Sequence, residues 1–102
     1  MKIPFELATT DEVASELGHR LRAHRLAQNF HQSELAARAG VSERALRNLE
    51  LTGRGTLDTF LRVAASLGLS GSLSSLFAST PKTIKEMEQA SVTRARASRK
   101  GS

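Results

Sequence analysis

The chain has 102 residues, no cysteine and a net charge of +5 at neutral pH, which is consistent with one domain and a single modest core and excludes disulfides and a thiolate metal site. It shows no apolar run long enough to cross a bilayer, and we expect a soluble, cytoplasmic protein without a signal peptide. The charge is uneven, because residues 1–19 carry one lysine against four acidic residues, whereas residues 20–54 carry seven arginines against three glutamates. This concentrates the basic surface in the middle of the chain, where a polyanion would bind.

The first predicted elements are a short N-terminal arm, residues 1–8, and a long helix. The arm contains a stretch, Lys2–Leu7, that could add a small strand. Thr9 followed by Glu12 is a capping box, which predicts that the helix begins there, and Asn29 is expected to end it. Its buried face is predicted from residues at helical spacing, namely Val13, Leu17, Leu21 and His24.

Two short helices follow, over residues 32–39 and from Ser42 to Leu51 or Thr52, and a tight turn at Gly40 joins them. Ser42 is placed to cap the second one. Helical spacing places four residues on a common core: Leu35, Ala36, Leu46 and Leu49. Ala36 and Ala45 are small enough for the two helices to cross closely at a steep angle. The pattern predicts a helix-turn-helix, with a plain αα-hairpin in a helical domain as the alternative.

The chain then predicts two more helices and a basic tail. Thr56 caps a fourth helix that ends at Gly68, with an apolar stripe of Leu57, Phe60, Leu61, Ala64 and Leu67. A fifth helix, about Ser72–Phe77, is expected to offer Leu73, Leu76 and Phe77 to the same core. The result is an all-α domain over residues 9–79. Residues 80–102 form a tail with six cationic against two acidic residues, expected to be partly disordered because its end lacks large apolar residues.

From Leu17 to Phe77 the chain resembles the Xre family, the Cro and phage-repressor type of helix-turn-helix protein. The resemblance joins separated features: Leu17-Gly18, Arg25, Gln32, Leu35-Ala36, Gly40-Val41-Ser42, Glu50 and Leu67-Gly68-Leu69. It implies a five-helix Cro/repressor-like fold, sequence-specific binding of double-stranded DNA as a homodimer on a palindromic operator, and no cofactor. The chain departs from the family at Glu50-Leu51-Thr52-Gly53, where many relatives carry Glu-Asn-Gly, and at His31, where Thr or Ser usually caps the second helix.

The resemblance also implies roles for individual residues. Base contacts are expected from the start and outer face of the third helix, at Ser42, Glu43, Arg44, Arg47 and Asn48. These side chains suit base edges, since Arg can bind guanine with two hydrogen bonds, Asn can bind adenine in the same way, and Glu can accept from cytosine N4. Phosphate contacts are expected from Gln32, Ser33, Thr52 and Arg54, and a partly buried ion pair from Arg25 and Glu50.

The tail suggests a second role. An Xre domain followed by Pro81 and a basic Arg-x-Arg end resembles the antitoxins encoded with HipA-type kinase toxins. This implies that the cationic residues of the tail bind the toxin: Arg94, Arg96, Arg99 and Lys100. The same residues would suit a DNA-binding arm equally well. We therefore expect an antitoxin that represses its own operon, with two alternatives: a stand-alone Xre-type regulator of phage or metabolic genes, or a protein-interaction module without specific DNA binding.

Two further expectations concern assembly and chemistry. The candidate dimer surfaces are the fifth helix and the N-terminal arm with Ile3 and Phe5, and the sequence does not choose between them. The histidines, His19, His24 and His31, match no catalytic or metal-ligand spacing. We therefore predict that the protein is not an enzyme and holds no metal.

Overall fold

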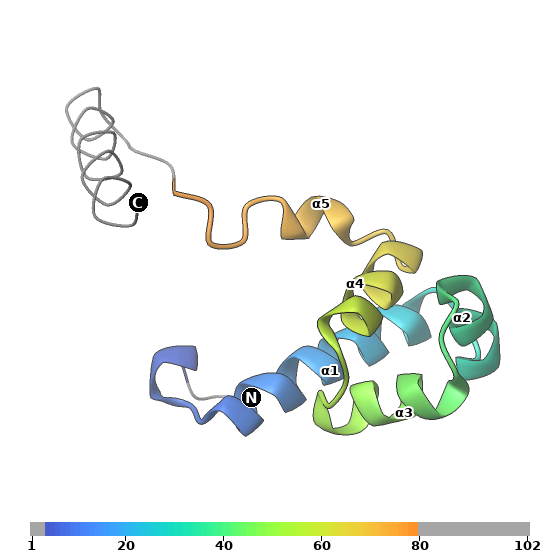
Figure 1. The fold of residues 1–102 in the computed structure, drawn as a ribbon, viewed down its shortest axis with the longest axis horizontal. Coiled ribbons are helices and arrows are strands. Elements are labelled where there is room, and N and C mark those ends of the chain that lie inside the picture. Colours follow the sequence, from blue (N-terminus) through green and yellow to red (C-terminus); the bar gives the residue numbers. More distant parts are fainter. Residues whose placement is uncertain (1–3, 80–102) are drawn as a thin grey trace, which may run out of the picture.

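The computed structural model describes residues 4–79, which form helices and no strand. The elements are η1 (Phe5–Leu7), α1 (Thr10–Ala27), α2 (Gln32–Ala39), α3 (Glu43–Thr52), α4 (Leu57–Ser66) and α5 (Ser70–Leu73). Helix α1 packs along α3, and α2 packs on both α3 and α4 (Figure 1). This all-α fold confirms the predicted fold class. None of the helices within residues 4–79 is long and apolar enough to span a membrane.

Hydroxyl side chains start three of the helices, as predicted. The Thr9 hydroxyl accepts from the Glu12 backbone N–H at 3.1 Å, and the Thr9 N–H donates to the Glu12 carboxylate at 2.9 Å. These two bonds form the capping box. The Thr9 N–H, which donates to the Glu12 carboxylate, is the main cause that holds the pKa of this carboxyl below its ordinary value. Ser42 caps α3 through the Ala45 N–H at 3.0 Å, and Thr56 caps α4 through the Thr59 N–H at 3.0 Å.

The turn between α2 and α3 depends on a left-handed residue. Gly40 follows α2 with a φ of 71°, a conformation that costs glycine nothing and strains most other residues. The chain reverses there and reaches the Ser42 cap two residues later. Asn29 plays a similar part after α1, with a φ of 60°, which asparagine tolerates better than other side-chain-bearing residues.

The core is built from α1, α2, α3 and α4. Its nine buried apolar residues are Leu21, Leu35, Ala36, Ala39, Leu46, Leu49, Val63, Ala64 and Leu67. The prediction that His24 is buried is wrong, because the buried face of α1 runs through Gly18, Leu21 and Arg25 and leaves His24 in solvent. Leu57 and Leu61 are also exposed, since they lie beside the buried stripe of α4 rather than within it.

Helices α1 and α3 approach so closely that two glycines separate their backbones. A Cβ on Gly18 would collide with the Leu49 carbonyl oxygen, and one on Gly53 would collide with the Ala14 carbonyl. The side-chain hydroxyl of Ser15 donates to the Thr52 carbonyl oxygen at 3.4 Å beside this contact. The end of α3 is therefore set against α1 by direct backbone contact.

The two ends of the described chain differ from the sequence prediction. The segment Lys2–Leu7 was considered as a possible small strand, but Phe5–Leu7 form one 3₁₀ turn; residues 1–3 lie outside the described part. The fifth helix is shorter and earlier than Ser72–Phe77, because it covers only Ser70–Leu73. The serines there compete with helical bonding, and the Ser74 hydroxyl donates to the Gly71 carbonyl at 2.8 Å. Leu73 still packs on the core, whereas Leu76 and Phe77 are exposed.

Candidate nucleic-acid interface

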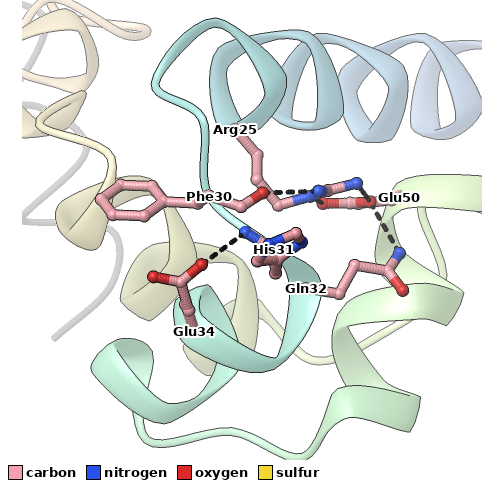
Figure 2. A network of polar contacts seen from close by, with 6 residues as sticks. All are labelled: Arg25, Phe30, His31, Gln32, Glu34 and Glu50. Atoms are coloured by element: carbon pink, nitrogen blue, oxygen red, sulfur yellow. Dashed lines mark hydrogen bonds and ion pairs between the residues drawn. The ribbon is translucent and has the colours of Figure 1, made fainter.

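A buried ion pair lies behind the two helices of the motif. Arg25 of α1 and Glu50 of α3 are only 7% and 1% exposed. The Arg25 guanidinium donates twice to the Glu50 carboxylate, from Nε to Oε2 at 2.7 Å and from Nη2 to Oε1 at 3.0 Å (Figure 2). Its Nη1 donates to the Phe30 carbonyl oxygen at 2.8 Å. Such a parallel, two-bond geometry is the strongest that an arginine and a carboxylate can form.

Gln32 extends this network to the start of α2. Its Nε2 donates to Glu50 Oε1 at 3.0 Å, so one carboxylate is bonded from both α1 and α2 (Figure 2). The network therefore fixes α3 against the helix before it in the motif and against the scaffold helix α1. The sequence predicted Gln32 only as a phosphate contact; the amide retains a second N–H that can still donate outward.

The start of α2 is otherwise open to solvent. The backbone N–H of His31 donates to Glu34 Oε1 at 3.1 Å (Figure 2). The Glu34 carboxylate therefore takes part in capping α2, whose cap position holds His31 instead of the usual Thr or Ser. His31 and Ser33 are exposed, and Gln32 is half-buried. The first turn of α2 thus presents backbone amides and a hydroxyl to the outside, which are donors suited to an anion.

Helix α3 divides sharply into two faces. Leu46, Leu49 and Glu50 are buried against the scaffold. The opposite face exposes the predicted base-reading side chains Glu43, Arg44, Arg47 and Asn48. Within residues 4–79 none of these four side chains has a hydrogen-bond or ionic partner, so their donors and acceptors are free to bind another molecule.

The arginines of residues 4–79 separate into two groups. Four are held by protein partners: Arg20 by Glu16 and the Phe5 ring, Arg25 by Glu50, Arg38 by the Phe30 ring, and Arg62 by Asp58. The other four have no such partner in this part of the chain: Arg22, Arg44, Arg47 and Arg54. Three of these lie on α3 or directly after it, so within residues 4–79 the unpaired arginines there outnumber the unpaired Glu43 carboxylate and the local charge is positive.

The loop after α3 is tied by a hydroxyl. Thr52 Oγ1 donates to the Asn48 carbonyl at 3.0 Å and accepts from the Arg54 backbone N–H at 3.3 Å. A phosphate accepts and cannot donate, so a contact to the Thr52 hydroxyl would have to replace the bond to Asn48. The Arg54 side chain and the Ser42 hydroxyl proton need no such exchange. The predicted tail residues Arg94, Arg96, Arg99 and Lys100 lie outside the described residues.

Helix α3 is short, exposes a face of cationic and amide side chains, and is fixed from behind by a buried polar network. It follows α2 across a tight turn. Together these features define a helix-turn-helix DNA-binding domain. The sequence profile described as helix-turn-helix matches residues 21–73, from within α1 to the end of α5. The chain therefore belongs to the Xre-like helix-turn-helix family, whose domain is that of a DNA-binding regulator. No curated protein matches the sequence closely enough to serve as a relative.

Proposed function

We propose that this protein is a sequence-specific transcriptional repressor that binds a palindromic operator as a homodimer in the bacterial cytoplasm. The observation that carries the proposal is the outer face of α3, where Arg44, Arg47 and Asn48 are exposed and have no partner within residues 4–79, while the Arg25–Glu50 pair fixes the inner face. A rigid helix with free donors on one side is what reading base edges in the major groove requires. The proposal includes no catalytic step and no cofactor.

The base contacts follow from side-chain chemistry. Arg44 lies in the first turn of α3 and suits guanine, to which its guanidinium can donate two parallel bonds. Asn48 lies one turn later on the same face and suits adenine. Glu43 can accept from cytosine N4, Arg47 can take a base or a phosphate, and the Ser42 hydroxyl can donate at the helix start.

Phosphate contacts come from both sides of α3 in this proposal. At the start of α2, the second amide proton of Gln32, the Ser33 hydroxyl and the free backbone amides face one strand, and the helix dipole favours the anion there. After α3, Arg54 adds a charge contact, and Thr52 joins only if its hydroxyl exchanges partners. These contacts set the register of α3 on the duplex rather than its sequence preference.

A dimer is proposed because one domain of this size presents too little surface for tight specific binding. Of the two surfaces suggested by the sequence, the C-terminal one is favoured. Leu76 and Phe77 are 55% and 96% exposed after α5, an arrangement that leaves large apolar side chains in water. In the arm, Leu7 is 77% exposed, but Phe5 already lies under the Arg20 guanidinium at 5.1 Å.

We propose further that the repressor is the antitoxin of a HipA-type kinase toxin and regulates their shared operon. The support is the sequence resemblance of the segment after Pro81, with its Arg-x-Arg end. Co-expression with the product of the neighbouring gene tests this, since a stable complex is expected if that gene encodes a HipA-like kinase. An unrelated metabolic or phage gene beside it would favour a stand-alone regulator instead.

Selection of binding sites from a library of random duplexes tests the repressor proposal itself. The expected product is a palindromic motif whose half-site centres lie about one helical turn, or 34–36 Å, apart. Failure to enrich any motif, with full-length folded protein, would refute specific recognition and favour a protein-interaction module.

A further inference from the structure

One large apolar side chain lies on the outer face of α3. Leu51 follows Asn48 by three residues, Arg47 by four and Arg44 by seven, so all four share one helical stripe. Its side chain is 58% exposed, whereas the other leucines of the helix, Leu46 and Leu49, are buried in the core. The stripe is therefore polar and cationic except for a single leucine.

The surrounding structure keeps Leu51 in that position. Its neighbour Glu50 is fixed on the inner face by hydrogen bonds from α1 and α2. The last turn of α3 is held by the bond from Thr52 to the Asn48 carbonyl and by the bond from Ser15 to the Thr52 carbonyl. The helix cannot rotate to bury Leu51 without breaking these contacts, so the leucine meets whatever α3 binds.

Duplex DNA offers one apolar group to a helix in the major groove, the C5-methyl of thymine. We propose that Leu51 is a specificity-determining residue that packs on the methyl group of one thymine in each half-site. The inference rests on the proposed repressor function and adds a contact to it.

The position of that thymine follows from helix geometry. Leu51 lies about 4.5 Å along the helix from Asn48 and about 10.5 Å from Arg44, at a rise of about 1.5 Å per residue. Base pairs are spaced by about 3.4 Å. The thymine is therefore expected about one or two base pairs beyond the base that Asn48 reads, on the side away from the base that Arg44 reads.

Replacing thymine by uracil removes only the methyl group and tests the contact without changing base pairing. The experiment uses the full-length protein and its selected operator, with uracil placed at each thymine of one half-site in turn. The wild type should lose about fourfold in affinity at one position, which corresponds to about 0.8 kcal/mol for one buried CH₂-sized group. Leu51→Ala should bind the thymine operator more weakly than the wild type. At the one sensitive position it should bind the uracil and thymine operators equally well, and at all other positions its uracil profile should match that of the wild type.

Leu26→Ala is the matched control, because Leu26 is a similarly exposed leucine on α1 and should leave the uracil profile unchanged. A uracil profile identical for wild type and Leu51→Ala, on an operator that both bind selectively, would overturn the assignment of Leu51 but leave the repressor proposal standing. A change in oligomeric state in Leu51→Ala with an unchanged profile would also overturn it, since Leu51 would then contact protein. Absence of any sequence-selective binding would refute both proposals.

Discussion

Removing the Glu50 carboxylate should cost more stability than any surface substitution in this domain. Glu50→Ala leaves the Arg25 guanidinium buried with only the Phe30 carbonyl as partner, and it also removes the acceptor of the Gln32 amide. Breaking one partner of a buried ion pair costs about 3–5 kcal/mol. In a domain of this size each 1 kcal/mol lowers the unfolding midpoint by about 4–8 °C, so a drop of at least about 12 °C is expected.

Thermal unfolding followed by circular dichroism measures this effect. Glu43→Ala is the control, because Glu43 is exposed on the same helix and its loss should change stability by about 0.5 kcal/mol or less. The double variant Arg25→Met with Glu50→Leu should recover much of the loss, since no uncompensated charge stays buried. Equal midpoints for Glu50→Ala and Glu43→Ala would refute the structural role of the pair.

Three other predictions test separate parts of the structure. Gly18→Ala should destabilise the fold by about 1–3 kcal/mol because its methyl group meets the α3 backbone. Gly71→Ala, which adds a methyl group in open space, should not destabilise it. Equal denaturation midpoints for the two variants would refute the close contact. Because the pKa of Glu12 is lowered, its charged cap stabilises the fold above pH 4.5, and this stabilisation is lost as the pH falls further. Glu12→Gln should therefore be less stable than the wild type at neutral pH and equally stable in acid. Ending the chain after Pro81 should abolish toxin co-purification while keeping the salt dependence of operator binding; a slope reduced by about 0.9 per lost phosphate contact would instead identify a DNA arm.

The sequence predicted the helices best where capping chemistry is local. Thr9, Ser42 and Thr56 each start the predicted helix, because the bonds that a cap makes reach only three residues along the chain. The fifth helix was placed wrongly because it has no such local cap. Its serine-rich segment has weak local preferences, so its length depends on tertiary contacts that end at Leu73.

Long-range contacts were harder to predict. The Arg25–Glu50 pair joins residues 25 positions apart, and it was expected only through the family resemblance. The Gln32–Glu50 bond and the close approach at Gly18 were not foreseen, because neither a lone glutamine nor a helical glycine carries a signal of its partner. Leu51 was placed at the end of a helix, but its exposure on the outer face is visible only in the structure.

The most direct test of the central claim compares Arg44→Ala with wild type on the selected operator and on random-sequence DNA of the same length and at the same salt concentration. Because the Arg44 side chain has no partner within the described chain and lies in the first turn of the exposed face of α3, its loss should weaken operator binding by about 1–3 kcal/mol. Binding to random DNA should stay nearly unchanged. Arg62→Ala, which removes an arginine paired with Asp58 on α4, should alter neither affinity. An equal loss on operator and random DNA for Arg44→Ala would contradict base reading by α3 and reduce Arg44 to a phosphate contact.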